Sequence, residues 1–405
     1  MKNGSAASES ALPLKRAKRI TALGEYFFDE LVRLKKNVQK RGGQVIDLSV
    51  GDPDLGAPLE AVRELQKRAE NPDNHHYASY KGLPAYRQAV ANWYRDFFAV
   101  DLDPETEVLA LIGSKGGMTH LPLTLVNPGD SVLLPDPAYS AYAAGIAVAE
   151  GVVHPMPLLE KNGYLPDLTE IPSDVARSAK LMFLNYPNNP TTACASLKFF
   201  EDVVDFARQH EVFIAHDAPY NLLCFDGEKH PSFLEARGAK DVGVEFHSFS
   251  KLFNMTGWRI SFVSGNRDLI DALGTLRGNF DMGPFIPIQQ AAAKVLGHAR
   301  SFIDQTVQVF QRRRDVLVEG LERLGWPVKR PRATFYCWVP VPEACSTRDF
   351  TCRLLNEAHI LVAPGTGFGP SGEGYIRFAL TVSEEKLQEV VQRLQDAGFV
   401  YPKQG

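Results

Sequence analysis

Short apolar runs alternate with segments of helical periodicity through the middle of the chain. Between about residue 106 and residue 265 the runs are near-continuous, as in strands that helices cover on both faces. Residues 197–208 place their apolar side chains on one helical face and predict a crossover helix. Because strands and helices alternate here, the pattern predicts an α/β fold with a mostly parallel sheet. The predicted strands are Val108–Ile112, Ser131–Leu134, Lys180–Leu184, Val212–His216, Val244–Phe249 and Ile260–Val263.

The pattern changes in the last third of the chain. Apolar residues at spacings of three, four and seven predict a long amphipathic helix over residues 303–324, with Arg312–Arg314 on its solvated face. Two strand-like runs follow, Thr334–Val339 and Tyr375–Leu380. A last helix begins at Ser383, a favourable N-cap residue that two glutamates follow. These elements predict a second, smaller α+β domain.

The two patterns divide the chain into three parts. Residues 51–290 are predicted to form a large domain around the parallel sheet, and residues 291–405 a small C-terminal domain. Residues 1–50 are predicted to be an N-terminal segment that packs with the small domain, because the buried sheet begins only later. A chain of 405 residues has ample material for these cores.

The composition narrows the classes of partner. The formal net charge is −4, which gives no electrostatic reason to expect nucleic acid or an anionic membrane. No stretch approaches the roughly 18 apolar residues of a transmembrane helix. The basic residues between Lys15 and Arg19 precede no apolar run of signal-peptide length, and they fit the solvated start of a helix better than a transit peptide. We therefore expect a soluble, cytoplasmic protein.

The five cysteines are scattered along the chain, and none forms a Cys-x-x-Cys pair. Their spacing indicates neither a disulfide framework nor a zinc site, so we expect reduced thiols and no bound metal.

Lys251 stands in an unusual place, directly after an apolar strand in Ser248-Phe249-Ser250-Lys251. A desolvated ammonium is costly without a partner, whereas Schiff-base formation removes the charge and makes the amine a covalent catalyst. Arg259 begins the next strand eight residues later, and its fork of donors suits a phosphate. A lone lysine at a strand end is more often structural, so the hypothesis depends on its companions.

Three polar residues follow neighbouring predicted strands. Asp217 ends one of them, and a carboxylate there could keep a pyridinium nitrogen protonated, as pyridoxal phosphate (PLP) needs in order to act as an electron sink. A turn or N-cap aspartate is an equally good interpretation. Tyr220 and Asn189 could each donate a hydrogen bond to the phenolic oxygen of the same cofactor.

Two further features suit anionic groups. Ser114 and Lys115 lie in the glycine-rich turn Gly113–Gly117, between a strand and a helix-like segment, where backbone amides can cradle a phosphate. The spacing matches neither a dinucleotide fingerprint nor a nucleotide P-loop. Arg377 lies in an apolar strand, where it is either part of an ion pair or the ligand of a substrate carboxylate.

Together these motifs resemble the class I and II aminotransferases, which are PLP enzymes of fold type I. The order matches over nearly the whole chain after about residue 20: a glycine-rich turn, Asn-Pro-Thr, Asp-x-x-Tyr, Ser-x-x-Lys, an arginine eight residues after the lysine, and a late arginine. The resemblance implies a large PLP-binding domain with a smaller α+β domain. It also implies transfer of an amino group between an amino acid and a 2-oxo acid, with 2-oxoglutarate and glutamate as one pair, by a homodimer with shared active sites.

The resemblance implies roles for single residues. Lys251 corresponds to the lysine that carries PLP and moves a proton at the α-carbon of the substrate. Asp217 corresponds to the partner of the pyridine nitrogen, and Tyr139 to the aromatic side chain stacked on the ring. The other implied cofactor contacts are Asn189 and Tyr220 at the phenolic oxygen, Ser114, Lys115, Ser248 and Arg259 at the phosphate, and Tyr77 at the phosphate in the neighbouring subunit. The implied substrate contacts are Gly51, Asn189 and Arg377.

Several stretches resemble bacterial LL-diaminopimelate aminotransferases within this family, Asn254–Arg259 among them. Gly116, Ser140 and Asn221–Leu223 depart from that pattern. The substrate therefore stays open, and aminotransferases for alanine, aspartate or aromatic amino acids are alternatives.

Other functions remain possible on the same fold. A carbon–sulfur β-lyase is one, because the same core stabilises a carbanion whose fate neighbouring groups decide. A transcription regulator built on this fold would need an N-terminal DNA-binding domain, and residues 1–45 are too short to form one.

Overall fold

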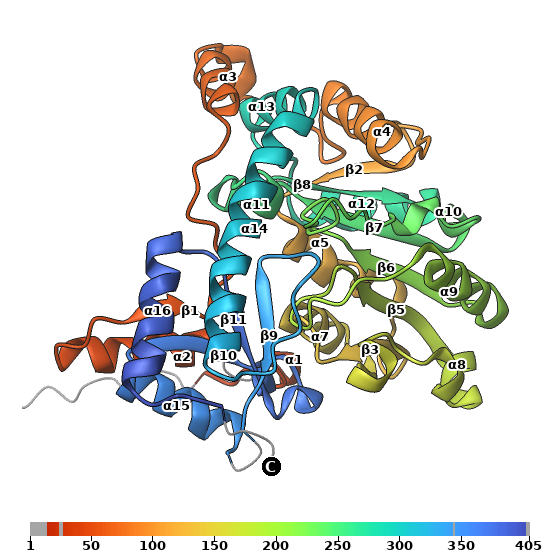
Figure 1. Cartoon of the computed structure of the whole chain (residues 1–405). Coiled ribbons are helices and arrows are strands. Elements are labelled where there is room, and N and C mark those ends of the chain that lie inside the picture. The colour runs from red at the N-terminus through yellow and green to blue at the C-terminus, as the bar shows by residue number, and fades with distance from the viewer. Residues whose placement is uncertain (1–13, 24–26, 343–344, 402–405) are drawn as a thin grey trace, which may run out of the picture.

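The larger of two domains is built on a seven-stranded sheet (Figure 1). The computed structural model describes residues 14–23, 27–342 and 345–401. The strand order is β2-β8-β7-β6-β5-β3-β4, in which β8 is antiparallel to both neighbours and the pairs from β7 to β4 are parallel. The predicted α/β fold with a mostly parallel sheet is therefore confirmed. The strands are β2 Val108–Leu111, β3 Ser131–Asp136, β4 Val152–Pro157, β5 Ala179–Asn185, β6 Phe213–Asp217, β7 Gly243–Ser248 and β8 Ser261–Gly265.

The edge strand β4 is not predicted by the apolar pattern. It contains Pro155 and Pro157, and most of its side chains are exposed or half-buried. A proline cannot donate to a strand ladder, so within sheets it is found at edges. The sequence of β4 therefore lacks the continuous apolar run that marks the inner strands.

Helices cover both faces of the large sheet, as the continuous apolar runs predict. Alternate side chains on a strand point to opposite faces. On β5, Met182 packs into a core with α4 and α9, whereas Phe183 packs into a core with α5, α7 and α12. The predicted crossover helix is α9. The helices of this domain are α3 Leu59–Ala69, α4 Pro84–Phe98, α5 Ser114–His120, α6 Pro122–Leu125, α7 Ser140–Val148, α8 Ser173–Ser178, α9 Leu197–His210, α10 Ala239–Val242, α11 Phe249–Leu252, α12 Arg267–Phe280 and α13 Ile286–Leu296.

The smaller domain has a four-stranded sheet in the order β1-β10-β11-β9. β1, which belongs to the N-terminal segment, pairs in parallel with β10, so elements from the two ends of the chain lie side by side (Figure 1). The divisions at residues 50 and 290 stay predictions. The strands are β1 Ile46–Leu48, β9 Tyr336–Pro340, β10 Ile360–Pro364 and β11 Tyr375–Ala379, and the helices are α2 Phe27–Lys40, α14 Ala299–Arg323, α15 Thr347–Glu357 and α16 Glu384–Asp396. The short helix α1 Lys18–Thr21 contacts α7 of the larger domain.

Two of the three consecutive arginines of α14 are buried, so the interpretation of Arg312–Arg314 as a solvated face is correct for Arg312 and wrong for the other two. Arg313 and Arg314 are 4% and 1% exposed. Arg313 pairs with Asp54 at 2.6 Å and Arg314 with Asp226 at 2.5 Å. Both carboxylates come from distant parts of the chain, so no local pattern on the helix indicates that they are there.

The five cysteines are free thiols. Among the residues that the structure describes, no helix is long and apolar enough to cross a membrane.

Candidate active site

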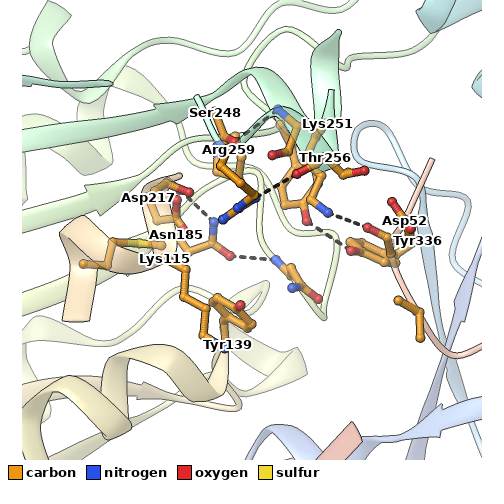
Figure 2. A pocket seen from close by; sticks show the side chains of 18 of the residues that line it. Asp52, Lys115, Tyr139, Asn185, Asp217, Ser248, Lys251, Thr256, Arg259 and Tyr336 are labelled. Atoms are coloured by element: carbon orange, nitrogen blue, oxygen red, sulfur yellow. Dashed lines mark hydrogen bonds between the residues drawn. The ribbon is translucent and has the colours of Figure 1, made fainter. Parts of the chain in front are cut away.

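A cavity of about 580 Å³ opens where the parallel strands of the large sheet end, and the small domain forms its other wall (Figure 2). Asn185, Asp217 and Ser248 are the last residues of β5, β6 and β7, and all three line it. Ligands of open α/β sheets bind at this edge. Most residues singled out from the sequence meet here: Gly51, Ser114, Lys115, Tyr139, Asn189, Asp217, Tyr220, Ser248, Lys251, Arg259 and Arg377.

Lys251 reaches the cavity from α11, a single helical turn directly after β7. The Ser248 hydroxyl caps this turn by accepting a hydrogen bond from the amide of Ser250 at 3.2 Å. The ammonium Nζ donates a hydrogen bond to the carbonyl of Gly51. Burial lowers the pKa of Lys251 to about 8. A substantial fraction of the amine is thus neutral near physiological pH, which a nucleophilic lysine requires.

Asp217 presents an unpaired oxygen to the cavity. Its Oδ2 accepts a 2.6 Å hydrogen bond from the hydroxyl of Tyr142, whereas the buried Oδ1 has no hydrogen-bond partner among the described residues. Burial raises the pKa of Asp217 to about 6, although the bond from Tyr142 lowers it. A buried acceptor without a donor is unfavourable, so this oxygen suits a ligand that carries a protonated ring nitrogen.

A cradle for an anion lies at the start of α5. Gly113 precedes the helix with a φ of 75°, and a Cβ there would overlap the guanidinium of Arg259. Arg259 itself has a φ of 54°, and its Nη1 donates to the carbonyl of Thr256 at 2.9 Å. The first residue of α5, Ser114, and the cap residue Ser248 line the same part of the site with Lys115. Free helix amides, hydroxyls and two cations together fit a phosphate.

Arg377 lies on β11 with its guanidinium in the cavity wall, 1% exposed. Its Nη1 donates to Oδ1 of Asn189 at 2.6 Å and its Nη2 to the carbonyl of Ser49 at 2.6 Å, and the guanidinium lies 4.1 Å from the ring centroid of Tyr336. No salt bridge joins it to a carboxylate within the described ranges, and its buried Nε has no partner there. The ion-pair interpretation of the sequence is therefore wrong, and an arginine in this state suits a carboxylate ligand.

Two tyrosines fix the substrate side of the cavity. The hydroxyls of Tyr220 and Tyr336 lie 3.1 Å apart, and burial raises the pKa of Tyr220 well above its usual value. Gly51 passes so close that a Cβ at this position would overlap the hydroxyl of Tyr336. The glycine is therefore required by a close approach of backbone to side chain.

The buried carboxylate of Glu245 connects two of the strands that end at the cavity, β6 and β7, with the helix α4. Glu245 on β7 accepts hydrogen bonds from His216, His247 and Tyr94, at 2.8, 2.8 and 3.1 Å, and from the hydroxyl of Ser232 at 2.6 Å. Burial would raise the pKa of Glu245, but the donating histidines hold it well below its usual range. His216 Nε2 accepts from the amide of Tyr186 at 3.2 Å, so its proton is on Nδ1 and the ring is neutral. This bond connects Glu245 with the loop that carries Asn189.

Tyr77 is the one predicted site residue that the cavity of its own chain does not include. Its side chain is 88% exposed and lies just before α4, on the outer surface of the chain. The described residues of one chain therefore do not bring Tyr77 to the other eleven predicted site residues.

Sequence reasoning did not identify Asn185, Tyr142 and Tyr336 as site residues. Asn185 donates to the carbonyl of Asp217 at 2.7 Å and accepts from the amide of Asn189 at 2.8 Å, so it orders the loop. Tyr142 lies in the first turn of α7, three residues after Tyr139, which is the N-cap residue of this helix. Its closeness to Tyr139 in the sequence could have indicated a second contact. Tyr336 gives no local signal.

The donor set fits PLP. An amine of lowered pKa, an unpaired buried carboxylate oxygen and a phosphate cradle face one cavity, and each matches one part of that cofactor. Fold and site thus define a PLP-dependent transferase of fold type I. The model of the family "Aminotransferase class I and II" matches residues 43–394. The chain belongs to this family, and it is a PLP-dependent aminotransferase that moves an amino group between an amino acid and a 2-oxo acid.

Relatives of established name are similar over almost their full length. The LL-diaminopimelate aminotransferase of Moorella thermoacetica is 47% identical over 382 residues, which covers 94% of this chain and 98% of the relative. That of Syntrophobacter fumaroxidans is 48% identical over 384 residues, with 95% and 99% covered. Among solved structures, substrate-bound BacF of Bacillus subtilis has a TM-score of 0.94 and 37% identity, with 97% of this chain and 100% of that chain covered. A probable N-succinyldiaminopimelate aminotransferase of Thermus thermophilus has a TM-score of 0.87 and 35% identity, with 92% and 100% covered.

Proposed function

We propose that this aminotransferase takes LL-diaminopimelate as amino donor or product, with 2-oxoglutarate and glutamate as the second pair. The observation that carries the proposal is the 47–48% identity to LL-diaminopimelate aminotransferases over nearly the whole chain. Gly116, Ser140 and Asn221–Leu223, which depart from the pattern of those enzymes, do not line the cavity. These departures therefore leave the lining of the site unchanged.

The cofactor contacts follow the implied roles. Lys251 would bind PLP covalently, Asp217 would hold the pyridine nitrogen protonated, and Tyr139 would cover the ring. When bound, PLP supplies an electron sink for the charge that develops at the α-carbon of the substrate. The phenolic oxygen takes hydrogen bonds from Tyr220 and from the amide nitrogen of Asn189, because the amide oxygen already accepts from Arg377. The phosphate ligands are Ser114, Lys115, Ser248 and Arg259.

The substrate lies between Arg377 and Lys251. Arg377 binds the α-carboxylate, and Asn189 on one side and the carbonyl of Ser49 on the other hold the guanidinium in place. Gly51 leaves room for the substrate because it has no side chain. The free amine of Lys251 would act as the general base that takes the proton from the α-carbon of the substrate, and as an ammonium it would then be the acid that gives this proton back. The lowered pKa of Lys251 suits this exchange at neutral pH.

A homodimer with shared sites completes the proposal. Tyr77 is exposed on a segment whose neighbour carries further exposed apolar residues, Phe280, Met282 and Phe285. The two segments are side by side, since the rings of His75 and Phe285 lie 5.6 Å apart. Exposed apolar surface of this kind marks an interface, and a two-fold axis would place Tyr77 at the phosphate cradle of the partner.

A half-reaction panel tests the substrate. The holoenzyme is mixed with single amino acids in excess, and the absorbance of the bound cofactor and the oxo-acid product are followed. We expect LL-diaminopimelate and glutamate to react, and alanine, aspartate and phenylalanine to react at least tenfold more slowly. Failure of LL-diaminopimelate while one of the others reacts would overturn the proposal.

Mixed dimers test the shared site. Lys251→Ala and Tyr77→Ala chains are unfolded together, refolded and reloaded with PLP. If Tyr77 acts across the interface, hybrids contain one intact site, and random pairing restores about a quarter of wild-type activity. The control mixes Lys251→Ala with Arg377→Ala, two residues of the same site, and should restore none. Activity no higher than that of the separate parents would refute the assignment of Tyr77.

A further inference from the structure

One aspartate of the segment that enters the cavity has no structural partner. Of the acidic residues from β1 to the start of α3, Asp47 on β1 pairs with Lys35 at 2.9 Å and Asp54 pairs with Arg313 at 2.6 Å. Asp52 instead lines the cavity, and no described residue forms a hydrogen bond or an ion pair with its carboxylate. The carboxylate is exposed at the mouth of the site (Figure 2).

The position of Asp52 along the segment follows the order of groups in a bound amino acid. The carbonyl of Ser49 contacts Arg377, where the α-carboxylate binds, and the carbonyl of Gly51 contacts Lys251, where the α-amine reacts. Asp52 is the next residue in this direction. A substrate held at both points therefore extends its side chain toward the carboxylate of Asp52.

The other charges of the cavity already have partners in the proposed function. Lys115 and Arg259 serve the phosphate, Arg377 the α-carboxylate and Asp217 the ring nitrogen. Burial lowers the pKa of Lys251, and among the charges that modify this effect Asp52 comes first and raises it. Asp52 is thus close enough to act on the charge of Lys251. Among the charged residues that line the cavity, it is a negative group to which the proposed function gives no contact with the cofactor.

We propose that Asp52 is a specificity-determining residue that binds the distal ammonium group of a diamino acid substrate. The inference rests on the proposed function, in which LL-diaminopimelate is that substrate. Its second ammonium is separated from the reacting carbon by a short chain of methylene groups, and a carboxylate at the mouth of the site is its natural partner. The same carboxylate disfavours a substrate whose distal group is only a carboxylate, such as glutamate or 2-oxoglutarate.

Loss of the Asp52 charge should affect the two kinds of substrate in different directions, whereas damage to the structure of the site would lower kcat/KM for both. Replacing Asp52 with asparagine removes the charge and retains the size. We expect kcat/KM for LL-diaminopimelate to fall about tenfold, the usual effect of one charge-assisted hydrogen bond at an exposed site. We expect kcat/KM for glutamate to stay constant or to rise. Any change in the pKa of Lys251 affects both substrates alike, so it cancels in their ratio.

The experiment compares wild type, Asp52→Asn, Asp52→Glu and Asp54→Asn as holoenzymes. The substrates are LL-diaminopimelate and 2-aminopimelate, which keeps the chain and the distal carboxylate but lacks the distal amine. Asp52→Asn should lower the preference for LL-diaminopimelate over 2-aminopimelate about tenfold, and Asp52→Glu should retain part of it. Asp54→Asn perturbs the same segment without removing charge from the cavity, so its preference should equal that of wild type.

The possible failures are distinguishable. A wild-type enzyme that uses LL-diaminopimelate but keeps its full preference in Asp52→Asn overturns the role of Asp52 and leaves the proposed function standing. A wild-type enzyme that transfers nitrogen from glutamate but does not use LL-diaminopimelate overturns both. An equal loss of preference in Asp54→Asn also counts against Asp52, because the loss would then follow the segment and not the charge.

Discussion

Asp217 should destabilise the protein when PLP is absent. Burial raises its pKa from the ordinary 3.8 to about 6. Because the unfolded carboxyl group ionises first as the pH rises, the folded apoenzyme loses stability between about pH 4 and pH 6 and stays less stable above that range. A shift of about two units corresponds to about 3 kcal/mol once both states are ionised.

The substitution Asp217→Asn removes this titration. The folded and unfolded pKa values give the cost of ionising Asp217 in the wild-type apoenzyme. They lower its free energy of unfolding by about 1.6 kcal/mol at pH 5 and about 3 kcal/mol at pH 8, compared with a side chain at this position that does not ionise. The stability of the apo variant, measured against that of the wild-type apoenzyme, should therefore rise by about 1.4 kcal/mol from pH 5 to pH 8. The hydrogen bond from Tyr142 to Asp217 is weakened at both pH values, so it largely drops out of this difference.

Urea unfolding of cofactor-free protein at pH 5 and pH 8 measures the effect. Asp304→Asn, an exposed position on α14, is the matched control and should show no such pH dependence. With PLP bound the order should reverse, because the wild-type carboxylate then has a cationic partner. A stability difference that is constant between the two pH values, or that shrinks at pH 8, would show that Asp217 is not held at raised pKa.

Three substitutions test other parts of the site. Gly51→Ala forces a Cβ against the hydroxyl of Tyr336, so we expect kcat/KM to fall at least about tenfold while circular dichroism stays unchanged; an enzyme of normal kinetics would contradict the contact. Glu245→Gln replaces one of the two acceptor oxygens with an NH2 donor, which would face a buried imidazole donor, because His216 and His247 each use a different oxygen of Glu245. The substitution should lower the free energy of unfolding by about 3 kcal/mol in urea titrations, and a variant as stable as the wild type would disprove this role of the carboxylate. Arg377→Lys replaces a fork with a point charge and should raise KM about tenfold to a hundredfold at little change in cofactor content, so unchanged steady-state kinetics would argue against a carboxylate at this position.

The sheet and the groups at its strand ends could be predicted because local sequence determines them. Continuous apolar runs identify inner strands, and polar residues directly after such runs come together at one edge of a parallel sheet. Asp217, Ser248 and Lys251 lie within a few residues of a predicted strand end, so their meeting in one cavity follows from topology. The sequence places Arg377 on a strand, but it does not decide between an ion pair and a free guanidinium. Only the folded structure shows that no carboxylate of the described residues pairs with it.

The remaining groups depend on approaches between distant segments. Arg313 and Arg314 appear as solvated residues on α14 because their partners, Asp54 and Asp226, are far away in the sequence. Tyr336 becomes a site residue only because the small-domain sheet packs against the segment that contains Gly51. Such contacts have no period and no fixed spacing, so the pattern of apolar and polar residues does not reveal them.

Lys251 and Asp217 have pKa values displaced in opposite directions by the same cause. Burial lowers the pKa of the lysine to about 8 and raises that of the aspartate to about 6, so at neutral pH each is held in a state that the surrounding protein disfavours. In the proposed function PLP would relieve both at once, since a covalent bond to Lys251 would remove the free ammonium and the protonated ring nitrogen would pair with Asp217. The two groups to which we assign the cofactor are therefore also two that destabilise the protein without it, and cofactor binding should stabilise the fold by more than the phosphate contacts alone provide.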